Sequence, residues 1–177
     1  MGIEALEEGR AWKFGDNIST DLIVPGKYFH LRSNLPELAK HVLEGATLEE
    51  SRKKFVEVVS RGDYIVAGRN FGMGSSREHA PIIIKLSGVG AVLARSFARI
   101  FFRNAINIGL PAIECDTSQI GPLDKLSINL RNGYVENKTK NEKVPFKPLP
   151  DIMRKILEDG GLVSYVTKNH GLVLPGV

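Results

Sequence analysis

Residues 63–79 read DYIVAGRNFGMGSSREH, and this stretch decides the fold. It begins with an apolar run typical of a buried strand, passes through a glycine-rich loop, and leads into an apolar helical run that ends at Leu86. Pro81 fits only the first turn of a helix, so we expect that helix to begin near Ala80. Such a strand–loop–helix turn directs backbone N–H groups and a helix N-terminus toward one small volume, which favours an anion.

The same alternation of strand and helix continues after Leu86. Residues 89–94 and 110–114 are short apolar runs, and a helical segment at 97–108 lies between them. Strands that alternate with helices predict a parallel sheet covered by helices. The sequence therefore predicts the α/β class, with a mainly parallel central sheet and flanking helices.

Local signals define the other expected elements. We expect one domain over residues 1–165, followed by a loosely held C-terminal tail at 166–177. The elements expected within that domain are a strand at 11–14, a loop at 27–34, helices at 36–45, 47–60 and 150–157, a linker at 145–150, and a hairpin of strands 126–130 and 134–138 around Asn132-Gly133.

Length, composition and charge exclude several classes of protein. The chain has 177 residues, of which 42% are hydrophobic and 25% charged, as in ordinary globular domains. No apolar stretch is long enough to span a bilayer, and the acidic, mixed start does not resemble a signal peptide. We therefore expect a cytoplasmic protein without membrane contact. The 24 basic residues are scattered among 20 acidic ones, so we expect no nucleic-acid partner.

The single cysteine limits the possible redox and metal chemistry. Cys115 cannot form a disulfide within the chain, and one thiol cannot hold an iron–sulfur cluster, which needs several thiolates. It ends the apolar run that begins at Leu110, so we expect a buried core side chain rather than a reactive thiol. We expect no metal site on this chain.

Polar side chains gather where the glycine-rich loop ends. After Gly74 come Ser75, Ser76 and Arg77, and the planar guanidinium of Arg77 can hold a carboxylate through two hydrogen bonds. The two serines either take part in chemistry or cap the following helix. The alternative for Arg77 is a surface ion pair with Glu78 or Glu114. The order of residues disfavours a hydrolase, because Gly-x-Ser-x-Gly is missing, and it lacks a clean dinucleotide fingerprint.

A second candidate segment lies in the loop at 27–34. It places Arg32 in otherwise apolar and aromatic surroundings, where the guanidinium is either a second carboxylate contact or an ordinary surface group. The neighbouring side chains that could read the rest of a ligand are Tyr28, Phe29, His30 and Leu31.

Four stretches of the chain resemble one known family. They are WKFGDN at 12–17, TDLIVPGKY at 20–28, NFGMGSSREHA at 70–80 and ARSFARIFFRNAIN at 94–107. Together they are similar to the small subunits of the aconitase superfamily, the swivel domains of the 3-isopropylmalate dehydratases and their archaeal-type relatives. The resemblance covers nearly the whole chain to about residue 165.

The resemblance implies a fold, a reaction and a partner. The fold would be a swivelling β/β/α layered domain. The reaction would be the reversible dehydration and rehydration of a hydroxy di- or tricarboxylic acid, such as the isopropylmalate isomerisation of leucine biosynthesis. A large subunit would carry the [4Fe-4S] cluster, and this chain would close over it without binding a cofactor itself. A different class, a non-catalytic anion-binding regulatory module, stays open.

The resemblance also implies residue roles. Ser75 would be the base that removes a proton from carbon, while Gly74, Ser76 and Arg77 would bind a substrate carboxylate. Arg32 would lie in the loop that reads the variable substituent. Tyr28, Phe29 and Leu31 suit the branched apolar group of isopropylmalate, whereas Arg32 suits the third carboxylate of homoaconitate; dimethylmalate is another possible substrate. We favour isopropylmalate.

Overall fold

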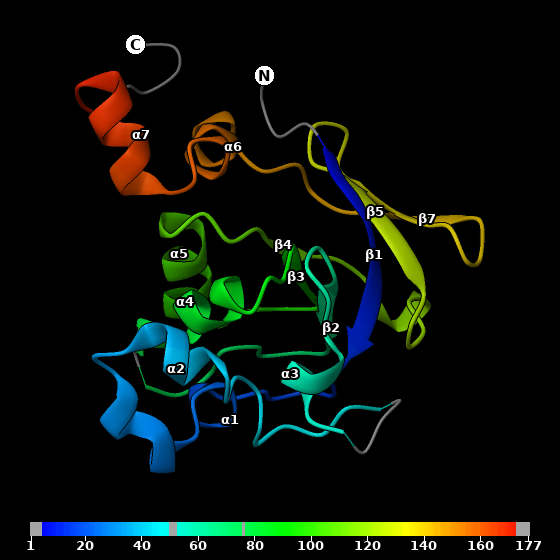
Figure 1. Ribbon diagram of the computed structural model, residues 1–177. Coiled ribbons are helices and arrows are strands. Elements are labelled where there is room, and N and C mark those ends of the chain that lie inside the picture. The colour runs from blue at the N-terminus through cyan, green and yellow to red at the C-terminus, as the bar shows by residue number, and fades with distance from the viewer. Residues whose placement is uncertain (1–4, 50–52, 76, 173–177) are drawn as a thin grey trace.

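A seven-stranded mixed sheet organises the protein, with its parallel strands between the helices and its antiparallel strands (Figure 1). The computed structural model describes residues 5–49, 53–75 and 77–172. Strand order is β4-β3-β2-β1-β5-β6-β7, in which β1 to β4 are parallel and β5 to β7 add antiparallel pairs. The strands are β1 (Ala5–Lys13), β2 (Tyr64–Ala67), β3 (Ala91–Ala94), β4 (Ala112–Glu114), β5 (Lys125–Asn129), β6 (Tyr134–Asn137) and β7 (Glu142–Pro145).

The main helices lie on one side of the parallel strands, and the antiparallel strands lie on the other (Figure 1). The helical elements are α1 (Thr20–Ile23), the 3₁₀ helix η1 (Gly26–Leu31), α2 (Leu35–Ala39), α3 (Phe55–Val58), α4 (His79–Leu86), α5 (Arg99–Asn107), the 3₁₀ helix η2 (Thr117–Gln119), α6 (Asp151–Glu158) and α7 (Leu162–Asn169). Within the described residues, no helix is long and apolar enough to cross a bilayer.

Two cores separated by the parallel strands account for the layers. Because side chains alternate along a strand, Ile65 faces a core shared with the helices, while its neighbour Val66 faces a second core. Leu126 and Val135 of the antiparallel strands pack into that second core. The antiparallel half of the sheet therefore covers the face that the helices leave open, which confirms the predicted β/β/α layers.

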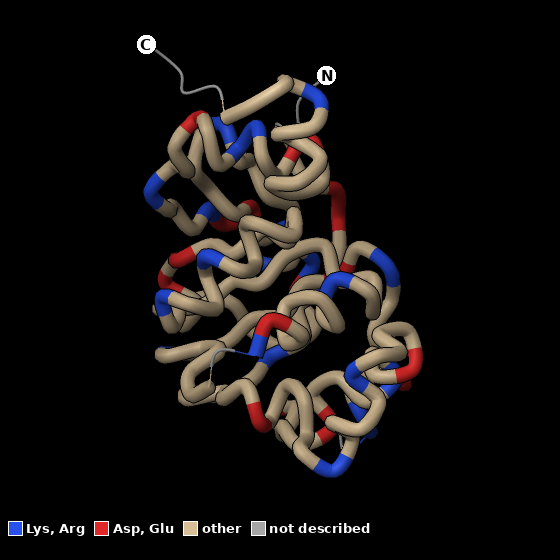
Figure 2. Tube along the Cα trace, turned by 90° about the vertical axis from the view of Figure 1, so that its left-hand side faces the viewer, with Lys and Arg blue, Asp and Glu red and all other residues tan. Residues whose placement is uncertain are grey.

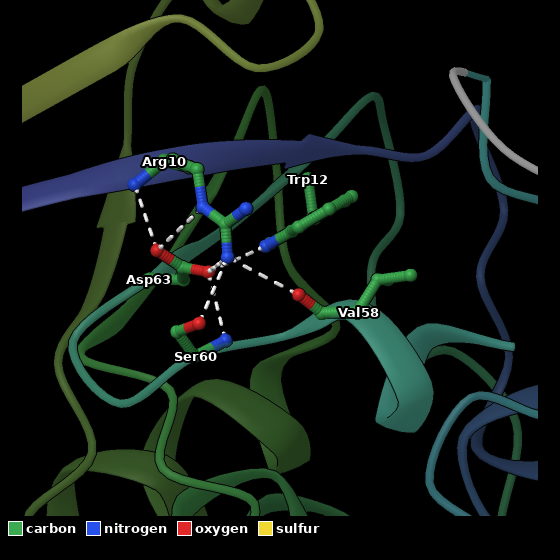
Figure 3. A network of polar contacts seen from close by, with 5 residues as sticks. All are labelled: Arg10, Trp12, Val58, Ser60 and Asp63. Carbon is green, nitrogen blue, oxygen red and sulfur yellow. Dashed lines mark hydrogen bonds and ion pairs between the residues drawn. The ribbon is translucent and has the colours of Figure 1, made fainter. Parts of the chain in front are cut away.

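A buried carboxylate joins β1 to the segment that precedes β2 (Figure 3). Asp63 accepts hydrogen bonds from the backbone and guanidinium of Arg10, from the indole of Trp12 at 2.8 Å and from the backbone of Ser60. Burial alone would raise the pKa of Asp63, but these donors outweigh it and hold the pKa below its ordinary value. The network fixes the start of β2, whose other end leads into the glycine-rich loop.

Two helices predicted in the first third of the chain are present but much shorter than predicted. The helix expected at 36–45 ends at Ala39, because Leu43 has a positive φ of 56° and donates its backbone N–H to Ile23 at 3.0 Å. The helix expected at 47–60 is reduced to the four residues of α3. Glu49 donates its backbone N–H to Lys13 at the end of β1, so tertiary contact overrules the local capping signal.

Most of the other predicted elements are confirmed, whereas α1, η1, β7 and α7 are among the elements that were missed. The strand at 63–68, the helix with Pro81 in its first turn, and the hairpin around Gly133 are all present. Strand β7 occupies a stretch just before the expected linker, where only Val144 is buried and alternation is hard to see. Helix α7 runs across position 165; the division into a domain and a tail stays a prediction.

Candidate active site

The loops that follow β1 and β2 meet at the carboxyl ends of these strands. Gly72 donates its backbone N–H to Ile18 at 2.7 Å, and Thr20 donates to Met73 at 2.8 Å. Strands β1 and β2 are parallel neighbours, so the segments after them emerge at the same edge of the sheet. Polar groups on the two loops are thereby brought together.

Glycine is required at two positions of the second loop. Gly72 has a φ of +77°, and a Cβ there would lie 2.2 Å from the ring of Phe101. Gly74 has a φ of +104°, a conformation that side-chain-bearing residues rarely adopt. The spacing of the glycines therefore serves loop shape and close packing on α5, and it delivers Ser75 to the surface.

Ser75 presents an exposed hydroxyl at the end of this loop. Its Oγ lies 3.3 Å from Oγ1 of Thr20, which is itself buried at the start of α1. Helix α4 has no side-chain cap hydrogen bond, so the capping alternative does not apply to Ser75. Ser76, the other serine of the prediction, lies outside the described residues.

Arg77 is held by the loop that follows β1. Its Nη2 lies 2.5 Å from Oδ1 of Asp21, and its Nη1 donates a hydrogen bond to the carbonyl of Val24 at 2.9 Å. The surface ion pair considered from the sequence, with Glu78 or Glu114, is therefore replaced by a pair with Asp21. These two contacts fix the orientation of the guanidinium, and the side chain of Arg77 is 24% exposed, so it is still reachable from solvent.

Phe29 brings the η1 segment to the same place. Its ring centroid lies 5.4 Å from Cζ of Arg77 and 5.3 Å from Cζ of Arg32, within the range of cation–π contacts. The ring of His79 meets Phe29 edge-on at 5.8 Å. Both candidate arginines therefore gather around one aromatic side chain, next to the Ser75 loop.

The remaining side chains of η1 point to different surroundings. Tyr28 turns toward Glu44, to which its hydroxyl donates at 2.9 Å, and Leu31 packs against the helix-side core. His30 is exposed, and its Nδ1 lies 3.0 Å from the carbonyl of Lys27. Of the four predicted specificity residues, Phe29 is the one that touches the candidate arginines.

Comparison with known proteins identifies the family of this chain. Residues 13–118 match the family described as the aconitase C-terminal domain, a range that includes both loops and η1. The chain belongs to the aconitase C-terminal domain family. The family resemblance seen in the sequence is confirmed.

Relatives of this aconitase C-terminal domain match over nearly their full length. A 3-isopropylmalate dehydratase small subunit from Archaeoglobus fulgidus is 60% identical over 163 residues, covering 92% of this chain and 95% of the relative. A methanogen homoaconitase small subunit from Methanothermobacter thermautotrophicus is 52% identical, with 94% of each chain covered. A crystal structure of 3-isopropylmalate dehydratase from Methanocaldococcus jannaschii matches with a TM-score of 0.85 at 43% identity, covering 94% of this chain and 95% of that one.

The single cysteine of this aconitase C-terminal domain is buried. Cys115 is buried in the core between the two halves of the sheet, and burial raises the pKa of its thiol to about 12, so it carries no thiolate near neutral pH. Across residues 5–49, 53–75 and 77–172, no group of three His, Cys, Asp or Glu side chains could hold a metal ion. The buried position of Cys115 agrees with the expectation of a core residue.

Charge is intermixed over the fold (Figure 2). Basic and acidic positions are interspersed along the trace, and several form surface pairs such as Lys40 with Glu37. Such exposed pairs contribute little to stability. The concentration of cationic groups around Phe29 is therefore a local feature of the candidate site.

Sequence reasoning missed three residues of this arrangement. Thr20 and Asp21 contact the site, and Glu44 anchors η1, yet none was assigned a role. A usable signal existed for the first two, since polar residues that follow adjacent parallel strands meet at one edge of a sheet. Glu44 gave no such signal, because its neighbours come from segments whose path depends on tertiary packing.

Proposed function

We propose that this chain is the small subunit of a hydroxyacid hydro-lyase of the 3-isopropylmalate dehydratase type. The observation that carries the proposal is the convergence of an exposed serine hydroxyl and a fixed, reachable guanidinium, those of Ser75 and Arg77, at the end of β2. The identity of more than half of all aligned positions with small subunits of this name supports the same reaction.

In this proposal, Arg77 binds a carboxylate of the substrate. Asp21 and the carbonyl of Val24 hold two of its nitrogens and leave the other donor positions of the guanidinium for a ligand. Phe29 lies against the guanidinium and limits how it can turn. A bound carboxylate is then oriented relative to Ser75, two residues earlier in the chain.

Ser75 removes the proton from carbon in this proposal. A serine hydroxyl is a weak base, so its alkoxide must be favoured by the N-terminus of α4, by Arg77 and by exclusion of water. Thr20, 3.3 Å away, can donate a hydrogen bond to the Ser75 oxygen. The [4Fe-4S] cluster of the large subunit would supply the Lewis acid that polarises the substrate hydroxyl.

Substrate choice depends on the η1 segment. Phe29 suits the branched apolar substituent of isopropylmalate, which makes that acid the first candidate. Homoaconitate is the second candidate, because Arg32 is exposed and no carboxylate within the described residues pairs with it. A site built around an arginine rejects a substrate that leaves the guanidinium unpaired, so one of the two acids should be clearly preferred.

Reconstitution with the large subunit tests the proposal. The purified complex is assayed with isopropylmalate, homoaconitate and dimethylmalate, and the isolated chain serves as the control. We expect turnover only in the complex, with isopropylmalate preferred. A reconstituted, iron-loaded complex that acts on none of the three acids, or an isolated chain that turns one over, would contradict the proposal.

A further inference from the structure

We propose that Glu44 is the positioning residue of the substrate-reading segment: it holds η1 so that Phe29 and Arg32 face the site. This inference rests on the proposed function for its kinetic consequence. Its structural part, that the place of Phe29 depends on Glu44, does not depend on any substrate or partner.

Four donors from three parts of the chain converge on this carboxylate. Oε1 of Glu44 accepts a hydrogen bond from the hydroxyl of Tyr28 at 2.9 Å. It also forms salt bridges with the ammonium groups of Lys27 and Lys54, each at 3.2 Å. Oε2 lies 2.9 Å from Nδ1 of His41. The Glu44 side chain is only 10% exposed, so these contacts occur in a partly desolvated setting, where hydrogen bonds to a charged group are strong.

The segment η1 depends on Glu44 because few other contacts hold it in place. None of its residues is buried, and its backbone hydrogen bonds are local, such as that from Tyr28 to Pro25 at 2.9 Å. Among the described residues, every side-chain hydrogen bond that leaves η1 ends on Glu44. Packing of Leu31 and Tyr28 against the core adds contact without a directional constraint.

Tyr28, which Glu44 holds through a hydrogen bond, directly precedes Phe29 of the candidate site. Tyr28 stacks on His41 with ring centroids 3.6 Å apart, and its hydroxyl is fixed by Glu44, so the backbone that carries Phe29 is held in place. Phe29 in turn touches the guanidinium groups of Arg32 and Arg77. A loosened anchor should therefore move the residues that read the substrate and leave Ser75, on another loop, unmoved.

The four donors also keep the anchor ionised. The hydrogen bond from His41 lowers the pKa of Glu44 most, burial opposes it, and Tyr28, Lys27 and Lys54 lower it further, to about 2. The carboxylate is thus an anion throughout the range in which an enzyme of this class would be assayed. Glu44→Gln keeps the shape and removes the charge.

A substrate-independent experiment tests the structural part. 4-Fluorophenylalanine is incorporated at Phe29 of the isolated chain, and its ¹⁹F resonance is recorded in the parent, Glu44→Gln and Tyr28→Phe proteins. We expect both variants to shift or broaden the resonance. Glu37→Gln is the matched control, because it removes a nearby charge whose salt bridge, to Lys40 at 2.6 Å, does not involve η1. An unchanged resonance in Glu44→Gln would overturn the inference.

The reconstituted complex tests the kinetic part. We expect Glu44→Gln and Tyr28→Phe to raise KM for the preferred acid and to reduce its discrimination against the other acids by about three- to tenfold, with kcat within about twofold of the parent. A purely structural role would lower the amount of active complex and leave the discrimination unchanged. Unchanged discrimination in both variants would overturn the inference, whereas a parent complex inactive on all three acids would remove the proposed function and leave the ¹⁹F result to decide on Glu44.

Discussion

Arg77 and Asp21 form an ion pair of 2.5 Å between the loops that follow β2 and β1. The pair explains how a residue in an irregular turn before α4 acquires a fixed orientation. The side chain of Asp21 is 66% exposed and that of Arg77 is 24% exposed, so the pair lies at the protein surface. At such a position the pair contributes little to stability and much to geometry.

Replacement of Asp21 by Asn should therefore weaken substrate binding without unfolding the protein. The guanidinium of Arg77 loses the charge that orients it, and we expect KM of the reconstituted complex to rise about tenfold. The thermal midpoint should stay close to that of the parent. Asp151→Asn, which removes an exposed carboxylate paired with Arg154 on α6, is the matched control. A tenfold rise in KM in the control as well would show that the effect is not specific to the site.

The hydroxyl of Ser75 should dominate the rate. Ser75→Ala removes the proposed base, and we expect kcat to fall by about 10²- to 10⁴-fold while the circular dichroism spectrum is unchanged. Thr20→Val removes only the neighbouring hydroxyl and should lower kcat by about tenfold or less. If Ser75→Ala kept near-parental turnover, a group other than Ser75 would have to remove the proton from the substrate carbon.

The glycine at position 72 should be intolerant of any side chain. Gly72→Ala places a Cβ 2.2 Å from the ring of Phe101 at a φ of +77°, so we expect a loss of about 2–4 kcal/mol in the free energy of unfolding. Gly15→Ala is the control, since a Cβ there meets nothing within 4 Å. Urea denaturation of both variants measures the difference, and equal stability would contradict the steric explanation.

The carboxylate of Asp63 should make stability depend on pH in the acid range. Its pKa is lowered in the folded protein, so it stabilises the fold at neutral pH and this contribution is lost as pH falls through the folded pKa, below the ordinary value of 3.8. We expect Asp63→Asn to cost about 2–4 kcal/mol at pH 7, because the donors of Trp12 and Arg10 lose their charged acceptor. The difference from the parent should shrink as the pH is lowered toward 2. A difference that stays constant with pH would indicate a packing effect of the amide.

The strands and helices that the sequence predicts well are those whose signals are local. The glycine-rich turn before α4, Pro81 in its first turn and the hairpin at Gly133 all depend on the backbone preferences of neighbouring residues. Leu43 is different: it is buried at 1% exposure with a positive φ, a conformation that only its tertiary surroundings stabilise. The helix expected through it could not have been excluded from the sequence.

The candidate site likewise contains residues whose place the sequence predicts and residues whose place it does not. Ser75 and Arg77 follow a strand and precede a helix, so their place at the end of β2 follows from order along the chain. The partner of Arg77 and the anchor of η1 come from segments 56 and 16 positions away from Arg77 and Tyr28, respectively. Such pairings depend on strand order and loop path, which the periodicity of one sequence does not specify.

Cys115 should be inert in the folded chain. Burial raises the pKa of its thiol from 9.0 to about 12, and the charge of Asp116 adds to the shift. At pH 8 the thiolate is scarce, so we expect alkylation by iodoacetamide to be roughly a thousandfold slower than in the urea-unfolded chain. Cys115→Ala should also assemble with the large subunit into a complex with the parental iron content, because no cluster ligand has been removed. Fast alkylation of the native protein, or loss of iron in the variant, would show that the thiol has a chemical role after all.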